Sequence, residues 1–217
     1  MQYSKKVSVG KVCRVMKSMS LPKMSTVKPR AASTKTDTAE TIRLQNLLKG
    51  DFNPKAPNQV WVSYITYVRV SERFCYVCAI MDLFSRKIIA YKASVKIDTK
   101  LVLETFYTAY RKRNYPTDVM FHSDRGSQYT AKAFRQALDK ANFVQSFSTK
   151  GHPYDNAVME SFFWYLKSEE LNRRYFKSFM DLRLSLFEYI VWFYNPNRPH
   201  SANKMLSPYV KEDNFYC

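Results

Sequence analysis

Residues 60–93 read VWVSYITYVRVSERFCYVCAIMDLFSRKIIAYKA, and this segment is the strongest indicator of the fold class. It is rich in Val, Ile, Tyr and Phe, and short turns at 71–72 and 84–85 divide it into three runs. β-Branched and aromatic residues favour strands, and short turns join neighbouring strands in antiparallel pairs. The segment therefore predicts three consecutive antiparallel strands, at 60–70, 73–83 and 86–93.

The chain after residue 94 changes to alternating helices and strands. Apolar residues at helical spacing predict helices, and short apolar runs between turn residues predict strands. The expected elements are a helix at 99–113, a strand at 118–122, a helix at 130–141, a strand at 143–147, and helices at 155–171 and 178–194. This order predicts an α/β fold with a mixed sheet flanked by helices.

The charge of the chain indicates a polyanionic partner. Its 217 residues include 35 Lys and Arg against 18 Asp and Glu, a formal net charge of +17. Such a balance is typical of proteins that bind nucleic acid or an anionic membrane surface. A hydrophobic content of 46% excludes global disorder. Since no apolar run approaches ~18 residues, a membrane-spanning helix is not expected.

The first quarter of the chain holds much of the excess charge. Residues 1–50 contain eleven Lys and Arg against two Asp and Glu. A short helix is expected at 7–19, followed by a Pro- and Ser-rich linker at 20–36 and a second short helix ending at Gly50. The first helix carries Lys11, Arg14 and Lys17. We expect this basic arm to contact DNA phosphates, the alternative being a solvated tail.

Two acidic residues occupy informative positions. Asp124 lies in HSDRGSQYT just after the strand expected at 118–122, where ligands bind in α/β sheets. Glu160 lies near the start of a helix that Asp155 or Asn156 is expected to cap. Two such carboxylates can converge on Mg²⁺, which completes its coordination with water and phosphate oxygens. Taken separately, they are better explained as a turn Asp and an exposed helix Glu, because turn and cap composition already accounts for both.

Several motifs together resemble a known family. Thirty-five residues separate Asp124 from Glu160, and the surrounding sequences are HSDRGSQYT at 122–130 and GHPYDNAVMESFFWYLKSEEL at 151–171. The ending YNPNRPHSANKMLSP at 194–208 fits the same pattern. These residues resemble insertion-sequence transposases with a retroviral-integrase-like core, in particular the second-frame product of two-frame elements.

The resemblance implies an RNase H-like fold with three parts. Residues 1–50 would be the basic DNA-binding arm, a remnant of an upstream helix-turn-helix region, and its linker. Residues 51–195 would be the integrase-like catalytic core, and residues 196–217 a C-terminal tail. Full-length relatives would extend further upstream, so the chain is expected to be truncated at its start.

The resemblance also implies a chemistry. A trio of carboxylates would hold two Mg²⁺ or Mn²⁺ ions that cut and join DNA at insertion-sequence ends, with Asp124 as the second carboxylate and Glu160 as the third. The implied partners are element ends, target DNA, further copies of the chain and a companion protein from the upstream reading frame. The implied location is the bacterial cytoplasm, in association with the nucleoid.

One expected carboxylate is missing. The family carries its first Asp three residues after a Trp, and here Tyr64 stands three residues after Trp61. A phenol with a pKa of ~10 is neutral at pH 7 and cannot bridge two cations. We therefore expect metal binding to be weakened or lost, and catalysis with it. Asp82 is a conceivable substitute, but we interpret it as structural, capping a turn and pairing with Arg86.

Other residues near the motifs have two interpretations each. Lys167, two helical turns after Glu160, is expected to hold a phosphate, and Arg125 either contacts phosphate or balances charge. His122 either orients the site or fills the core. Gly126 permits a left-handed turn or close approach of DNA. Asn156 either supports the site residues or serves only the fold. Trp164 and Phe163 are expected in the core rather than stacked on bases.

Two rival functions remain open from the sequence. The first is a non-catalytic DNA-binding remnant or regulator of transposition, which would bind element ends without metal-dependent nicking. The second is an unrelated nuclease with the same fold, which would nick DNA without preference for those ends.

Overall fold

A computed structural model describes residues 8–19 and 44–217 of the chain. The first part contains one helix, α1 (Val9–Ser18), which agrees with the helix expected at 7–19. The side chains of Lys11 and Arg14 on this helix are exposed. The linker expected at 20–36 lies outside the described residues, as does most of the helix expected to end at Gly50.

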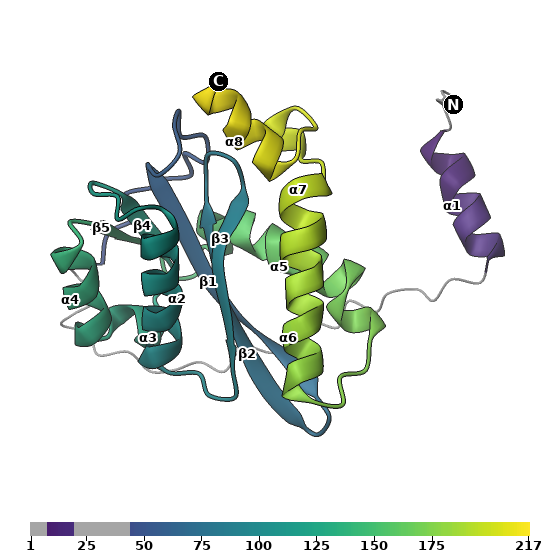
Figure 1. The fold of residues 1–217 in the computed structure, drawn as a ribbon, viewed down its shortest axis with the longest axis horizontal. Helices are drawn as coiled ribbons and strands as arrows, with labels where there is room; N and C mark the ends of the chain where they lie inside the picture. Colours follow the sequence, from purple (N-terminus) through teal and green to yellow (C-terminus); the bar gives the residue numbers. More distant parts are fainter. Residues whose placement is uncertain (1–7, 20–43) are drawn as a thin grey trace. The chain divides into compact units, whose positions relative to one another are not determined.

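The second part is built on a five-stranded mixed sheet, which confirms the expected α/β class (Figure 1). The strand order is β3-β2-β1-β4-β5; β1 pairs with β2 and β2 with β3 antiparallel, whereas β1 pairs with β4 and β4 with β5 parallel. The strands are β1 (Val60–Val70), β2 (Arg73–Asp82), β3 (Lys87–Ser94), β4 (Met120–Ser123) and β5 (Val144–Phe147).

Helices flank this sheet. The α-helices are α2 (Thr99–Lys112), α3 (Ser127–Thr130), α4 (Lys132–Lys140), α5 (Ala157–Glu169), α6 (Phe179–Phe187), α7 (Asn195–Asn197) and α8 (Pro208–Tyr216). Short 3₁₀ turns are η2 (Pro153–Asn156), η3 (Leu171–Arg173) and η5 (Ser201–Asn203), and η4 (Glu188–Tyr194) is a π-helix. No helix of the described part is both long and apolar enough to cross a membrane.

Strand periodicity produces two cores, one on each face of the sheet. Side chains alternate along a strand, so Trp61 joins one core and its neighbour Val62 joins the other. The core that contains Trp61 is covered by α2 and α4 through residues such as Phe106 and Phe134. The opposite core is covered by α5, α6 and η4, and Figure 1 shows the two groups of helices on either side of the sheet.

Local chemistry explains where several helices begin. The side chain of Asp98 accepts a hydrogen bond of 3.0 Å from the backbone N–H of Leu101 and so caps α2. Ser178 and Asp181 form a reciprocal capping box at the start of α6. The helix expected at 178–194 is interrupted, because regular α-helix ends at Phe187 and the π-helix η4 follows.

The segment before β1 differs from the expectation. Residues 44–50 form turns rather than the end of a helix, and Gly50 takes a left-handed φ of 78°. The reason lies in β5, where the hydroxyl oxygen of Ser146 accepts hydrogen bonds from the backbone N–H groups of Leu47 and Leu48. These bonds attach the segment to the sheet edge and replace helical hydrogen bonds.

Residues after 195 pack onto the start of β3. The side-chain amide of Asn195 bonds both the N–H and the carbonyl of Ile88, and Asn203 donates to the carbonyl of Ser85 at 2.7 Å. The buried carboxylate of Glu212 on α8 forms ion pairs with Lys87 and Arg113. The C-terminal segment therefore belongs to the same compact unit as the sheet.

Candidate active site

Strand register aligns Tyr64 with Asp124. Parallel strands β1 and β4 pair Val62 with His122, so the residues two places further on in each chain lie level with one another. Because side chains alternate with a period of two, Tyr64 projects from the same face of β1 as Val62, and the charge of Asp124 acts on its phenol. Asp124 follows immediately after the last residue of β4.

Helix α5 brings Glu160 to the same place. Glu160 lies in the first turn of α5 and is exposed. Just before this helix, the side-chain amide of Asn156 donates a hydrogen bond of 3.0 Å to the carbonyl of Ser63 on β1. Further along α5, the ring of Phe163 packs 6.0 Å from the ring of Tyr64. The start of α5 is thus held against β1 beside Tyr64.

Electrostatics show that the three side chains share one site. Burial raises the pKa of Tyr64, and the negative charges of Asp124 and Glu160 raise it further. Burial also raises the pKa of Asp124, and the N–H of Gly126, which donates to Oδ1 of Asp124 at 2.9 Å, opposes this shift. The phenol is therefore held neutral beside two acidic groups.

Gly126 is needed for space rather than for backbone freedom. Its φ is −58°, so the expected left-handed turn is wrong. A Cβ atom at this position would lie 3.0 Å from Oδ1 of Asp124 and 2.9 Å from Oε1 of Gln128. A side chain at this position would therefore require the Asp124 carboxylate and the end of Gln128 to shift.

These donors do not fit a two-metal centre. A pair of divalent ions requires several anionic oxygens, and within residues 8–19 and 44–217 no cluster of three His, Cys, Asp or Glu side chains can hold a metal. The third side chain of the group, Tyr64, is a neutral phenol. Asp124 and Glu160 alone are two ligands, which is what a single hydrated Mg²⁺ ion uses.

Asp82 cannot supply the missing carboxylate. It is fully buried, and its Oδ2 accepts from the N–H of Asn58 at 2.8 Å and pairs with Arg113 at 3.3 Å. Burial raises its pKa to about 6, and Arg113 opposes that shift. In the sheet Asp82 lies opposite Trp61, three residues or ~10 Å along β1 from Tyr64.

Asp82 does bind the turn that follows β2, because its Oδ1 accepts from the N–H of Phe84 at 3.0 Å. The expected ion pair between Asp82 and Arg86 is wrong. The guanidinium of Arg86 instead donates to the carbonyl of Leu83 at 2.6 Å, and Arg113 from the end of α2 takes its place.

Two expected phosphate ligands have partners within the protein. The ammonium of Lys167 lies 4.7 Å from the centroid of the Tyr67 ring, and burial lowers its pKa. Arg125 donates from Nε to the carbonyl of Ser148 at 2.9 Å and from Nη2 to that of Leu44 at 3.1 Å. Arg125 thereby clamps two loops, which gives it a structural role whether or not it meets DNA.

His122 supports the strands beneath the site. It is fully buried, with Nδ1 2.9 Å from the hydroxyl of Ser146 and Nε2 3.2 Å from that of Ser148. Burial lowers its pKa to about 4, although Asp155 opposes the shift. His122 is therefore neutral at pH 7 and ties β4 to the end of β5.

Two sequence expectations around α5 need correction. Asn156 is the N-cap residue, but neither side chain makes a capping hydrogen bond: Asp155 accepts from the N–H of Thr149 at 2.7 Å, and the amide of Asn156 donates to Ser63. Phe163 is buried as expected, but Trp164 is 54% exposed. The bond from Asn156 to Ser63 was not foreseen, because no local pattern reveals a contact between residues so far apart in the chain.

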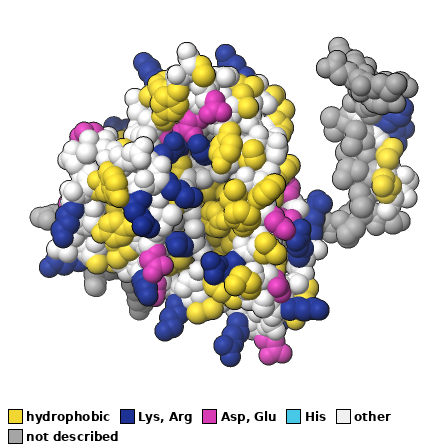
Figure 2. All heavy atoms as spheres, in the orientation of Figure 1, with side chains coloured by type: hydrophobic (Ala, Val, Ile, Leu, Met, Phe, Trp, Pro, Cys, Tyr) yellow, Lys and Arg dark blue, Asp and Glu magenta, His cyan; other side chains and the backbone are white. Residues whose placement is uncertain are grey.

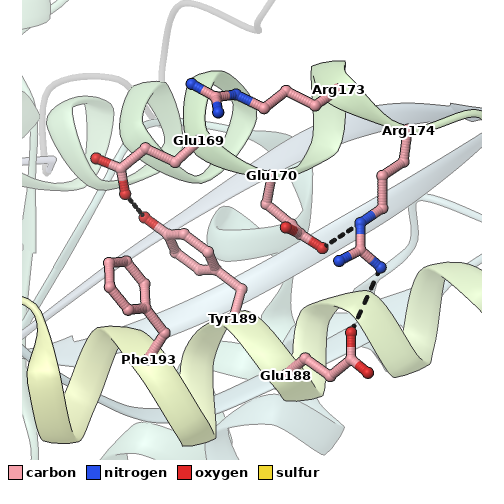
Figure 3. A pocket seen from close by; sticks show the side chains of 7 residues that line it. All are labelled: Glu169, Glu170, Arg173, Arg174, Glu188, Tyr189 and Phe193. Atoms are coloured by element: carbon pink, nitrogen blue, oxygen red, sulfur yellow. Dashed lines mark hydrogen bonds and ion pairs between the residues drawn. The ribbon is translucent and has the colours of Figure 1, made fainter.

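A separate hollow of about 390 Å³ lies where the end of α5 and η3 face η4 (Figure 3). Its lining residues are Glu169, Glu170, Arg173, Arg174, Glu188, Tyr189 and Phe193. Arg174 pairs with Glu170 at 2.9 Å and with Glu188 at 3.4 Å, and the hydroxyl of Tyr189 donates to Glu169 at 2.6 Å. Arg174, Glu170 and Glu188 are thus paired within the hollow, and its lining includes neither Asp124 nor Glu160.

Comparison with known proteins identifies the family. Residues 54–153 match a family model described as "Integrase core domain", and residues 142–208 match a second model of the same description. The chain is 37% identical over 163 residues to the transposase for insertion sequence element IS904 of Lactococcus lactis, covering 75% of this chain and 64% of the relative. Together the two models place residues 54–208 of the chain in the integrase core domain family.

A second relative is the transposase InsF for insertion sequence IS3A of Escherichia coli. It is 38% identical over 164 residues, which cover 76% of this chain and 57% of InsF. The chain thus spans less than two thirds of the length of these relatives.

Solved structures show the same fold at low identity. The catalytic core domain of HTLV-2 integrase, solved in complex with magnesium, has a TM-score of 0.57 at 14% identity, and the match covers 74% of this chain and 99% of the integrase chain. The catalytic domain of Mos1 mariner transposase has a TM-score of 0.53 at 16% identity, and the match covers 62% of this chain and 70% of the Mos1 chain. The RNase H-like architecture expected from the sequence is confirmed.

Proposed function

We propose that this chain acts on insertion-sequence DNA, binding the element ends, and that it has lost the ability to cut them. The observation that carries the proposal is the placement of Tyr64 level with Asp124 and beside Glu160, where the family has its first carboxylate. A neutral phenol provides no charge to hold a second divalent ion.

Charge supports DNA as the partner. The formal net charge is +17, and Figure 2 shows Lys and Arg side chains spread over the face in view. Such a surface binds phosphates through release of counterions, without regard to sequence. The proposed partners are element ends and target DNA, with further copies of this chain and a companion from the upstream frame in the same nucleoid-associated complex.

The same observation favours a second function, that of a non-catalytic regulator. A chain that occupies element ends without cutting them would compete with an active transposase. In a mixture, it would lower cutting by an active copy in proportion to its occupancy of the ends. A nuclease of unrelated function would instead cut DNA without preference for these ends.

The decisive experiment compares this chain with its Tyr64→Asp variant on DNA carrying the element ends, in Mn²⁺. Tyr64→Asn serves as the matched control, because it removes the ring without adding a charge. We expect binding of the ends by all three proteins and nicking by Tyr64→Asp alone. Equal nicking by the unmodified chain would overturn the proposed loss of activity, and equal binding of scrambled DNA would overturn the proposed recognition of ends.

A further inference from the structure

Trp164 on α5 is an exposed indole with no evident structural purpose. It is 54% exposed, whereas the neighbouring Phe162 and Phe163 are 2% and 4% exposed and fill the core. A large aromatic side chain left in water forgoes the stabilisation that its burial would provide. Exposed Trp side chains are common where a protein meets a partner, so the position of this indole relative to the candidate active site decides its interpretation.

The position of Trp164 on the helix places it beside the candidate active site. At ~100° per residue, Trp164 is turned about 40° from Glu160 around the axis of α5, and Lys167 about 20° to the other side. A carboxylate of the site, an indole and an ammonium thus lie within about 60° on one helix face. The buried residues of α5, such as Phe162 and Leu166, lie on the other side.

The indole is held in place although it is exposed. Its ring lies 4.9 Å from that of Tyr165 at an interplanar angle of 82°. The guanidinium of Arg198 lies 3.9 Å from the centroid of the Tyr165 ring, and Arg198 is fixed in turn by Glu169 at 2.8 Å. A side chain supported in this way loses little conformational entropy when a ligand stacks on it.

We propose that Trp164 stacks on a base of the DNA strand whose backbone passes Glu160 and Lys167, so that the site takes an element end with unpaired bases. This inference rests on the proposed function. Within a continuous duplex both faces of a base are covered by its neighbours, so an indole beside the strand reaches a base face there only where the base has left the stack. Base–aromatic stacking tolerates any sequence, which suits a residue beside a phosphate-handling site.

A nucleic acid fits this face better than an apolar protein surface. Along the helix, Glu160 lies one turn before the indole and Lys167 nearly one turn after it, so a partner must place polar groups beside an aromatic one. A DNA strand does this, since each nucleotide joins a stacking base to a phosphate. The net charge of +17 also favours an anionic occupant.

The test uses the whole chain and two DNA duplexes, one with a fully paired element end and one whose outermost bases are mismatched. Trp164→Leu is compared with Trp192→Leu, because Trp192 is 69% exposed on the separate helix η4. We expect Trp164→Leu to weaken binding of the mismatched end by at least about five-fold, the lower limit for one stacked base, and binding of the paired end much less. Trp192→Leu should change neither.

Tryptophan emission provides a second readout. The chain has three Trp residues, and Trp61 is fully buried, so a Trp192→Phe variant reports on Trp164 when DNA is added. Stacking should quench its emission more with the mismatched end than with the paired one.

Equal affinities of both Leu variants for the mismatched end, or equal quenching by both duplexes, would overturn the inference about Trp164. Binding of paired element ends would then still uphold the proposed function. Failure to prefer element ends over scrambled DNA would overturn both.

Discussion

The side-chain amide of Asn156 donates a hydrogen bond of 3.0 Å to the backbone carbonyl of Ser63. This bond joins the residue before α5, the helix that carries Glu160, to the strand residue before Tyr64. Asn156 is only 3% exposed, so water does not compete with the bond. The position of Glu160 relative to Tyr64 therefore depends in part on the side-chain amide of Asn156.

Replacing Asn156 by Ala should lower the free energy of unfolding by about 2 kcal/mol, because the buried carbonyl of Ser63 loses its side-chain donor. Urea unfolding followed by circular dichroism measures this. The matched control is Asn172→Ala at an exposed position, which should be nearly neutral. Equal losses in both variants would show that the bond contributes nothing specific.

Tyr64→Asp should make thermal stability depend on metal. Without metal, a third carboxylate beside Asp124 and Glu160 adds repulsion, so the melting temperature should fall below that of Tyr64→Asn. Millimolar Mn²⁺ should then raise the melting temperature, because the ion binds the folded state. At concentrations of ~10–100 times Kd, this binding adds about 1–3 kcal/mol to the free energy of unfolding. A melting temperature of Tyr64→Asp that ignores Mn²⁺ would contradict the proposed position of the first carboxylate.

Gly126→Ala should impair metal binding more than folding. A φ of −58° suits Ala, but its Cβ would lie 3.0 Å from Oδ1 of Asp124 and displace the carboxylate. In the Tyr64→Asp background we expect Mn²⁺ affinity, measured by calorimetry, to fall by ~10-fold, as for other changes that misorient a metal ligand. Ser127→Ala, at the next and exposed position, should leave affinity unchanged.

Acid should destabilise the fold through His122. Burial lowers its pKa from 6.5 to about 4, so the unfolded chain binds a proton before the folded chain does. The stabilisation is complete above pH 6.5 and is lost as the pH falls towards 4. Between pH 7 and pH 5 the loss should be about 2 kcal/mol relative to His122→Gln. His152→Gln, at an exposed site, should follow the unmodified chain; parallel pH profiles for all three would refute the assignment.

Glu212→Gln should destabilise the chain by about 3 kcal/mol, because it leaves Lys87 and Arg113 without the buried carboxylate that neutralises them. Denaturant unfolding measures the change. The adjacent exposed Asp213→Asn is the control and should lie within about 0.5 kcal/mol of the unmodified chain. A loss no larger than that of the control would mean that α8 contributes little to the unit.

Local pattern was sufficient to predict most of the fold. Alternating apolar residues and short turns identify β1, β2 and β3, because strand formation and strand pairing across a tight turn are local events. The candidate carboxylates were also apparent from sequence, since Asp124 and Glu160 lie within recognisable motifs, as does the substitution of Tyr64 for the first Asp.

What the sequence by itself determined, then, was the order of strands and helices and the candidate residues Asp124, Glu160 and Tyr64. The tertiary structure alone decided their partners. Arg113 rather than Arg86 pairs with Asp82, the side-chain amide of Asn156 donates to Ser63 instead of making a capping bond to α5, and Trp164 faces solvent. The physical reason is that a side chain's partner depends on the register between distant strands and on the side of a helix left uncovered. Both are set by packing between segments far apart in the chain, which local spacing does not encode.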